Sequence, residues 1–280
     1  MAAFVKGHGT ENDFVLLPDP DGALSLTAEQ VQAVCDRRAG IGGDGVLRVV
    51  RTAADTEARA LPGSGGTTWF MDYRNADGSV AEMCGNGIRV FARFLVDEGL
   101  AEAGEIAVLT RDGVKAVRLG AAGDVTVEMC PAGLPGTDRK VRIDGAGPAL
   151  VGWLPAVEVD MGNPHAVVFV DDLADVGELR TAPVVEPAFP DGVNVELVVR
   201  RGPRHVAMRV HERGVGETRS CGTGACAAMV AAARQDGVTG GSTYVVDVPG
   251  GRLGVTERAD GQVELTGPAV LVARGVTELV

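Results

Sequence analysis

The chain has 280 residues, of which 45% are hydrophobic and 23% charged, and its formal net charge at pH 7 is -12. This composition is typical of a globular protein, and the length predicts about two domains. The excess of acidic side chains argues against nucleic acid or an anionic membrane as a partner, because both require a basic surface. A small molecule is therefore the expected ligand.

No segment of the sequence has the pattern of a membrane span or a signal peptide. The longest uninterrupted apolar run, residues 225–233, is far shorter than the ~20 residues that cross a bilayer. Residues 1–13 include the charged Lys6 and Glu11 and contain no apolar core typical of a signal peptide. The sequence therefore predicts a cytoplasmic protein.

The first quarter of the chain predicts strands and one helix. Residues 5–17 and 46–50 are rich in β-branched residues and predict strands. Between them, Thr27 is followed three residues later by Gln30, which is the capping-box pattern of a helix over residues 27–37. Residues 52–67 have no counterpart later in the chain and are expected to be an insertion.

A helix is predicted directly after Cys84. Apolar residues recur there with helical spacing, and Arg89 and Arg93 share another face, so we expect an amphipathic helix. Strand patterns follow at residues 106–110, 114–118 and 125–129.

The middle of the chain is rich in glycine and proline. Residues 133–155 contain five Gly and three Pro and are expected to connect two domains. Farther along, the run at residues 225–233 follows Cys221 and is apolar on every side. This pattern predicts a helix at the centre of its domain.

The two halves of the sequence repeat each other. The segment Glu-Met-Cys-Gly-Asn-Gly around Cys84 resembles Arg-Ser-Cys-Gly-Thr-Gly around Cys221, at an offset of 137 residues. Further matches recur in the same order at an offset of 137 or 138, namely the turns at 111–113 and 249–251, Pro131 and Pro268, and Gly99 and Gly237. This order predicts a duplicated unit and two domains related by a pseudo-two-fold axis.

Five cysteines without a Cys-x-x-Cys pair argue against a disulfide framework and against a thiolate zinc site, so no metal is expected. Cys84 and Cys221 each stand at the predicted start of a helix, where N–H groups and the helix dipole are expected to lower a thiol pKa. The glycines that follow allow backbone amides to approach a carboxylate closely.

Two such cysteines suit a reaction that inverts a carbon centre. If the domains face each other, a thiolate can remove a proton from one face of a carbon while a thiol returns one to the other face. The sequence has no P-loop, dinucleotide or pyridoxal motif. The residues therefore favour a racemase or epimerase that needs no cofactor and acts next to a carboxylate.

Several motifs resemble those of the diaminopimelate epimerase family. They are HGTENDF at 8–14, RAGIGGDG at 38–45, NADGS at 75–79, MCGNG at 83–87, GNPH at 162–165, GVNV at 192–195, ERGVGET at 212–218 and CGTGA at 221–225. The family interconverts LL- and meso-2,6-diaminoheptanedioate for lysine and peptidoglycan-precursor synthesis. The resemblance therefore implies an isomerase without pyridoxal or metal.

The resemblance also implies roles for particular residues. Cys84 and Cys221 would be the proton donor and acceptor, and His165 and Glu212 would tune their pKa values. The implied substrate contacts are Asn12, Asn75, Gly85, Asn86, Asn163, Asn194, Glu212, Arg213, Gly222 and Thr223. Amides of the two turns would hold the reacting carboxylate. The other three cysteines, Cys35, Cys130 and Cys226, are expected to be structural.

The fold implied by the resemblance is the α+β fold of the proline racemase group. It has two pseudo-two-fold related domains, each a curved, mostly antiparallel sheet around a central helix. Residues 1–124, completed by 265–280, would form the first half and residues 125–264 the second, with the active site in the cleft between them. The resemblance further implies a homodimer.

Two departures and three alternatives accompany this interpretation. Thr10 and Glu11 stand where the family usually has Leu and Gly, and some relatives have Gln where this chain has Gly45. One alternative is a proline or hydroxyproline racemase, which the polar groups for a second substrate end disfavour. The second is a thiol switch in which Cys84 and Cys221 form a disulfide. The third is a ligand-binding module that has lost its chemistry, which the presence of both cysteines disfavours.

Overall fold

The computed structural model describes residues 1–120 and 123–280. These residues divide into two compact units: unit 1 comprises Met1–Val127 and Gly267–Val280, and unit 2 comprises Glu128–Thr266. The boundaries expected from the sequence, after residues 124 and 264, lie two or three residues earlier. Both units combine a mixed sheet with few helices, which confirms the α+β class.

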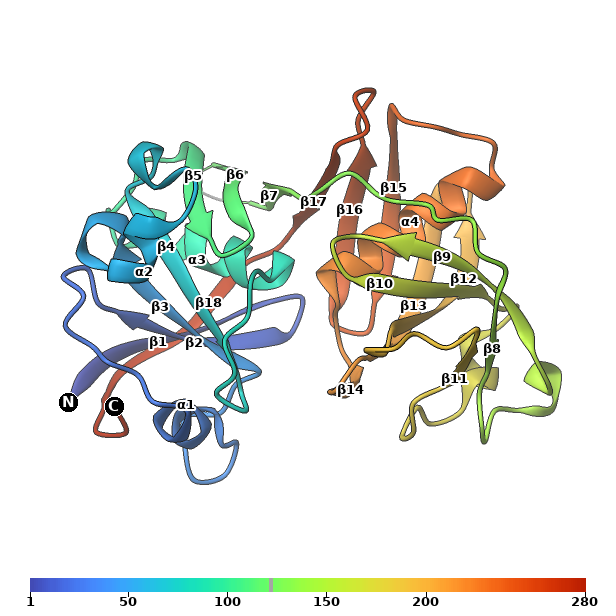
Figure 1. Ribbon diagram of the computed structural model, residues 1–280, viewed down its shortest axis with the longest axis horizontal. Helices are drawn as coiled ribbons and strands as arrows, with labels where there is room; N and C mark the ends of the chain where they lie inside the picture. The colour runs from blue at the N-terminus through green and yellow to red at the C-terminus, as the bar shows by residue number, and fades with distance from the viewer. Residues whose placement is uncertain (121–122) are drawn as a thin grey trace. The chain divides into compact units, whose positions relative to one another are not determined.

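Unit 1 is a sheet around the helix α3 (Gly85–Asp97), which contacts strands on several sides (Figure 1). In order of pairing its strands are β18 (Val270–Thr277), β1 (Ala2–Gly9), β2 (Asn12–Pro18), β3 (Gly45–Arg51), β4 (Trp69–Asn75), β5 (Gly104–Thr110), β6 (Gly113–Leu119) and β7 (Val125–Glu128). The pairs β2–β3 and β4–β5 are parallel, and the other pairs are antiparallel.

Unit 2 repeats this topology around α4 (Gly222–Gln235). The strands that correspond to β1–β7 are, in order, β9 (Leu154–Asp160), β10 (Pro164–Phe169), β12 (Asn194–Gly202), β13 (His205–Glu212), β15 (Ser242–Val248), β16 (Gly251–Glu257) and β17 (Val263–Gly267). Here β10–β12 and β13–β15 are the parallel pairs. The shorter strands β8 (Arg139–Arg142), β11 (Val184–Glu186) and β14 (Gly216–Thr218) are added to this plan.

The strand register relates positions in the two units. Phe14 pairs with Gly45 across β2 and β3, and His165 pairs with Asn194 across β10 and β12. Two residues farther along β3 and β12 lie Leu47 and Glu196. The duplication therefore makes Phe14 equivalent to His165, Gly45 to Asn194, and Leu47 to Glu196. By the same register Asn12 corresponds to Asn163, and Asn75 to Glu212.

Local signals in the sequence predict several helix ends correctly. Helix α1 (Ala28–Cys35) begins with the expected capping box of Thr27 and Gln30. Gly99 and Gly237 follow α3 and α4 with φ of 67° and 69°, the left-handed conformation that ends helices and favours glycine.

Helix α3 is enclosed rather than amphipathic. Arg89 has no exposed surface and Arg93 is 6% exposed, contrary to the expectation of a polar face. The Arg93 guanidinium donates hydrogen bonds to the backbone oxygens of Gly120 and Gly123, at 3.1 and 2.8 Å. These bonds compensate for burial of the charge. Helix α4 is buried as predicted, since residues 225–233 have no exposed surface.

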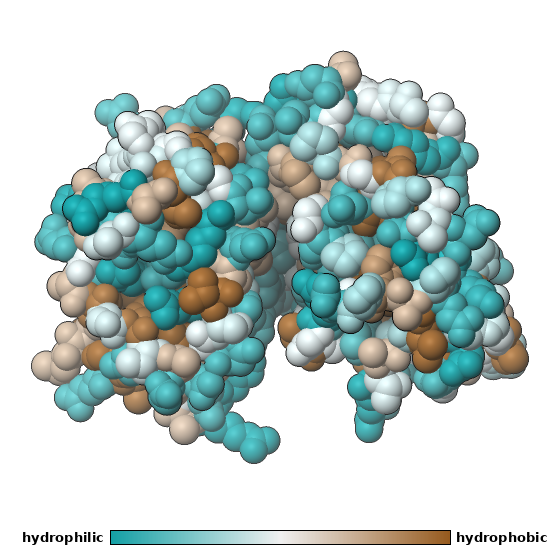
Figure 2. Space-filling model, viewed as in Figure 1, coloured by the Kyte–Doolittle hydropathy of each residue, from teal (hydrophilic) through white to brown (hydrophobic). Residues whose placement is uncertain are grey.

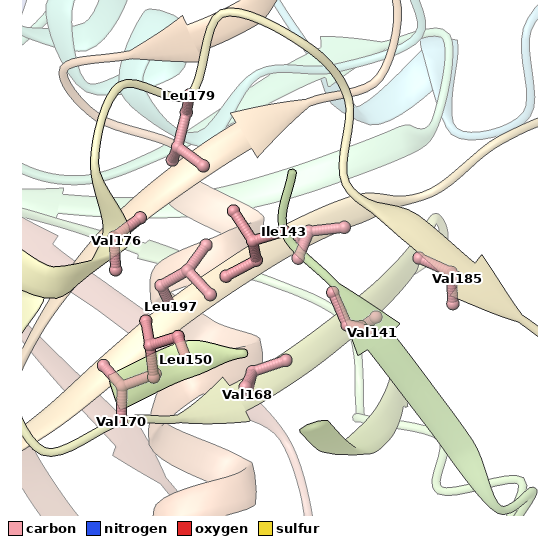
Figure 3. Close-up of a cluster of buried hydrophobic side chains, with 11 residues drawn as sticks. Val141, Ile143, Leu150, Val168, Val170, Val176, Leu179, Val185 and Leu197 are labelled. Carbon is pink, nitrogen blue, oxygen red and sulfur yellow. The ribbon is translucent and has the colours of Figure 1, made fainter. Parts of the chain in front are cut away.

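Residues 133–155 do not connect two domains, and that prediction is wrong. They contain β8 and a 3-10 turn (Pro148–Leu150) within unit 2. Val141 and Leu150 pack with Val168 and Leu197 in the hydrophobic cluster of Figure 3. The glycines of this segment serve turns inside the unit, as Gly145 shows with φ of 85°.

The insertion in unit 1 consists of short helices. They are η1 (Thr52–Ala54), α2 (Thr56–Ala60) and η2 (Ser64–Gly66). Ala58 is buried against Phe70 and Leu109, so the insertion contributes to the core of unit 1.

The helices of residues 1–120 and 123–280 are all too short or too polar to cross a membrane. The face of the molecule shown in Figure 2 is largely hydrophilic, with small apolar patches.

The backbone of the turn between β1 and β2 is strained, because two residues with side chains adopt positive φ there. Thr10 and Glu11 have φ of 50° and 62°, where a side chain is unfavourable. Replacing the exposed Glu11 by Gly should therefore stabilise the protein by roughly 0.5–1 kcal/mol and raise the Tm by about 2 °C in a thermal melt. Glu102→Gly is the control, because Glu102 has no positive φ. An equal rise in Tm for both variants would contradict this account.

Candidate active site

Cys84 is the N-cap of α3, as the sequence predicts. Its Sγ accepts a hydrogen bond from the Gly87 amide at 3.4 Å, and its thiol lies 3.6 Å from Asn12 Oδ1. Asn86 Nδ2 donates to the same Asn12 oxygen at 3.1 Å. The structure thus brings together three of the predicted site residues at the start of this helix.

Asp44 holds Asn12 in place. Its Oδ2 accepts hydrogen bonds from Asn12 Nδ2 at 2.7 Å and from the Asp13 amide at 3.1 Å. Arg37 in turn pairs with the other Asp44 oxygen at 2.6 Å. The sequence indicates a turn residue at Asp44 but gives no sign of its contact with Asn12, because 32 positions separate the two.

Asn75 lies at the end of β4, opposite Gly45. Tyr73 donates a hydrogen bond from its hydroxyl to Asn75 Oδ1 at 2.8 Å, and Asn75 Nδ2 donates to Ser79 Oγ at 3.0 Å. A Cβ at position 45 would come within 2.5 Å of the Arg74 carbonyl oxygen and 2.8 Å of the Tyr73 ring. Glycine at position 45 is therefore required by the close approach of the Arg74 carbonyl oxygen and of the Tyr73 ring, whose hydroxyl positions Asn75.

Cys221 occupies the equivalent position in unit 2, as the N-cap of α4. Its Sγ accepts a hydrogen bond from the Gly224 amide at 3.3 Å and lies 3.5 Å from Thr223 Oγ1. Cys221 is 6% exposed, and it is hydrogen-bonded to Glu212. The carboxylate of Glu212 also accepts a hydrogen bond from Thr218 Oγ1.

The electrostatics of Cys221 differ from the sequence-based expectation. Burial raises the pKa of the Cys221 thiol well above its usual range, and the charges of Glu212 and Glu196 raise it further. Hydrogen bonds from Thr223 and Gly224 oppose this shift without reversing it. The expectation that the helix N-terminus lowers this pKa is therefore wrong for Cys221, because burial and two carboxylates outweigh the hydrogen bonds that the thiol receives there.

Burial also raises the pKa of Glu212. The charge of Glu196 adds to this effect, whereas hydrogen bonds from Thr218 and Cys221 and the charge of His165 lower the pKa. A cation placed beside Glu212 would favour its ionised form.

His165 and Glu196 form a fully buried pair. His165 Nδ1 lies 2.7 Å from Glu196 Oε1, and both side chains have no exposed surface. On its other side, His165 Nε2 lies 3.0 Å from Asn163 Oδ1. The sequence motifs single out His165 and Asn163, but not Glu196.

The remaining predicted residues of unit 2 are also connected. Asn194 Oδ1 accepts a hydrogen bond from the Arg213 amide at 3.0 Å, and Asn194 Nδ2 donates to the Pro164 carbonyl oxygen at 3.2 Å. The Arg213 side chain is exposed, with one guanidinium nitrogen 3.3 Å from the Asp191 carbonyl oxygen.

Two of the other cysteines, Cys35 and Cys226, lie in the cores of their units. Cys35 is buried in the core of unit 1, and its burial raises the thiol pKa to about 11. Cys226 has no exposed surface on α4. Within the part of the chain that the structure describes, no group of three His, Cys, Asp or Glu side chains is arranged to hold a metal.

Solved structures of several enzymes share this fold over nearly the whole chain. A PhzF-family phenazine biosynthesis protein from Bacillus anthracis has a TM-score of 0.70 at 18% identity, with 98% of each chain covered. A hydroxyproline epimerase from Agrobacterium vitis has a TM-score of 0.66 at 16% identity, covering 98% of this chain and 91% of that one. A probable proline racemase from Agrobacterium radiobacter has a TM-score of 0.68 at 15% identity, covering 100% of this chain and 94% of that one. The fold is thus one that racemases and epimerases use.

Sequence relatives define the family more narrowly. The model of the family described as diaminopimelate epimerase matches residues 4–134 and 157–272. A diaminopimelate epimerase of Streptomyces coelicolor is 61% identical, with 98% of this chain and 94% of the relative covered. A diaminopimelate epimerase of Mycolicibacterium smegmatis is 50% identical, with 97% of this chain and 95% of the relative covered. The chain therefore belongs to the diaminopimelate epimerase family, and it is an isomerase.

Proposed function

We propose that this chain interconverts LL- and meso-2,6-diaminoheptanedioate without a cofactor, in lysine and peptidoglycan-precursor synthesis. The observation that carries the proposal is the repeated site, in which Cys84 and Cys221 cap equivalent central helices of two duplicated units. Relatives named for this activity support diaminopimelate over proline or hydroxyproline as the substrate.

The reaction requires a base and an acid on opposite faces of the α-carbon. One cysteine, as a thiolate, takes the α-proton, and the thiol of the other cysteine donates a proton to the opposite face. Each turnover thus leaves the two sulfurs in exchanged protonation states. The first-turn amides of α3 and α4, at Gly85, Asn86, Gly222 and Thr223, would stabilise the negative charge that develops on the reacting carboxylate.

The polar groups around the two cysteines suit the ends of this substrate. Arg213 would pair with the distal carboxylate, while Glu212 and the oxygens of Asn12, Asn75, Asn163 and Asn194 would accept hydrogen bonds from ammonium groups. An ammonium beside Glu212 would also offset the negative charge that raises the pKa of Cys221. Substrate binding would thereby make the Cys221 thiolate more accessible.

The decisive experiment follows LL-2,6-diaminoheptanedioate in deuterated water with dialysed protein and a chelator present. We expect the meso isomer to appear with deuterium at one α-carbon. L-proline and trans-4-hydroxy-L-proline, tested in parallel, should not react. Absence of turnover with diaminoheptanedioate, or equal turnover with a proline, would refute the proposal.

Tyr73 gives a test of the substrate contact assigned to Asn75. Tyr73→Phe removes the hydroxyl that orients Asn75, so KM should rise about 3-fold to 10-fold while kcat changes little. The control is Tyr244→Phe, which removes a hydroxyl bonded to Asp236, a residue outside the proposed site. Steady-state kinetics with an unchanged KM in Tyr73→Phe would show that Asn75 does not need this support.

We also propose that the protein acts in the cytoplasm as a homodimer, as the family resemblance implies. Val270, Val272 and Val276 on β18 are 41–64% exposed and offer apolar surface for a second copy. Light scattering coupled to size exclusion should give twice the chain mass. A monomer at working concentrations would refute the dimer and leave the activity untouched.

A further inference from the structure

The duplicated units differ in the residues beneath their cysteines. A Cβ added at Gly87, three residues after Cys84, would contact the side chains of Leu47 and Phe14 at 3.4 and 3.5 Å. A Cβ added at the equivalent Gly224 would instead come within 2.7 Å of Glu196 Oε1. The apolar pair Phe14 and Leu47 thus lies beneath the start of α3. The ionisable pair His165 and Glu196 occupies the equivalent positions beneath the start of α4.

The position of Glu196 is unusual for a carboxylate. It lies in β12 between Val195 and Leu197, has no exposed surface, and its Oε2 has no hydrogen-bond partner among the described residues. Burying a carboxylate with only one oxygen bonded is costly. Its proximity to the first turn of α4 offsets part of this cost, because a helix N-terminus favours negative charge.

Glu196 is connected to the proposed substrate site through His165. With Glu196 bonded to Nδ1, the ring is fixed and its Nε2 faces Asn163. A hydrogen bond at one ring nitrogen of a histidine sets the state and direction of the other. In unit 1 the equivalent Asn12 is held by Asp44 instead.

We propose that Glu196 is a positioning residue of the Cys221 side: it orients His165 against Asn163 and makes the two cysteines chemically unequal. This inference rests on the proposed function for its catalytic consequence. Its effect on Cys221, however, is measurable without turnover. The titratable groups on neighbouring elements are Glu212 on β13 and Cys221 at the start of α4.

The first test is alkylation of the full-length protein by iodoacetamide over a pH series, with each cysteine quantified by mass spectrometry. Removing the negative charge in Glu196→Gln removes one cause of the raised pKa of Cys221, so its alkylation should shift to lower pH. Cys84 serves as the internal control, and its profile should stay unchanged. An unchanged Cys221 profile, or an equal shift at both cysteines, would overturn the proposal.

A second variant protects the test against misfolding. The double variant His165→Phe with Glu196→Leu gives unit 2 the apolar pair of unit 1, and it should show the same shift of Cys221. A Cys221 profile that remains at the wild-type pH in this variant would also overturn the proposal.

Kinetics then test whether Glu196 acts through His165. Glu196→Gln should lower kcat/KM about 10-fold to 100-fold and change its pH profile. The same substitution in a His165→Phe background should cause no further loss, whereas a multiplied loss would show that Glu196 acts independently. If wild-type protein does not epimerise diaminoheptanedioate, the proposed function fails while the alkylation result still decides the role of Glu196.

Discussion

Replacing either Cys84 or Cys221 by Ala should reduce epimerisation at least about 1000-fold, because each variant lacks a group that must accept or donate a proton. The two losses should be similar, since the reaction needs both groups in every turnover. Appearance of meso-2,6-diaminoheptanedioate from the LL isomer measures the effect. Exchange of the α-proton in deuterated water should persist in part, on the side that keeps its thiol.

The matched control is Cys130→Ala. Cys130 is half-buried in unit 2, and the proposed mechanism assigns it no role. Its loss should leave kcat/KM within about two-fold of wild type. Full activity in either Cys84→Ala or Cys221→Ala would remove the two-base mechanism, and a large loss in Cys130→Ala would reveal an unassigned role.

Gly224→Ala should lower kcat/KM about 100-fold. The new methyl group would lie 2.7 Å from Glu196 Oε1 and 3.3 Å from Cys221 Sγ, so Glu196 must move and its bond to His165 must weaken. Overpacking at this buried position should also destabilise the protein by roughly 1–3 kcal/mol. Kinetics and thermal melts of the purified variant measure the two effects separately.

The duplication supplies the control for this experiment. Gly87 occupies the same position in α3, but a methyl group there makes ordinary contacts of 3.4–3.5 Å. Gly87→Ala should therefore keep activity within about three-fold, and alanine should favour the helix by roughly 0.5–1 kcal/mol. Equal losses in the two variants would mean that glycine is needed for a reason shared by both turns, such as approach of the substrate.

Features encoded by short stretches of sequence were predictable. The capping box of α1, the cysteine N-caps of α3 and α4, and the glycines that end both helices follow from local rules. The repeat offset also predicts two units with one topology. Most predicted site residues can be placed for the same reason, since they lie in contiguous motifs.

Features that depend on distant partners were not predictable. Glu196 lies 31 positions from His165 and is flanked by Val195 and Leu197, so nothing local indicates its bond. Burial of Arg89 and Arg93 depends on the strands that enclose α3. The raised pKa of Cys221 depends on burial and on carboxylates from two other strands. Residues 133–155 were wrongly predicted to connect two domains, because glycine and proline mark turns within a domain as readily as linkers.

The pairing of β18 with β1 has a consequence for folding during synthesis on the ribosome. β18 pairs with β1, so the sheet of unit 1 joins the two ends of the chain. The sheet of unit 1 cannot be completed until residues 270–277 have been synthesised, although residues 1–127 of the same unit emerge first. Contacts of such long sequence separation slow folding, and β1 presents an unpaired edge to other nascent chains until β18 arrives.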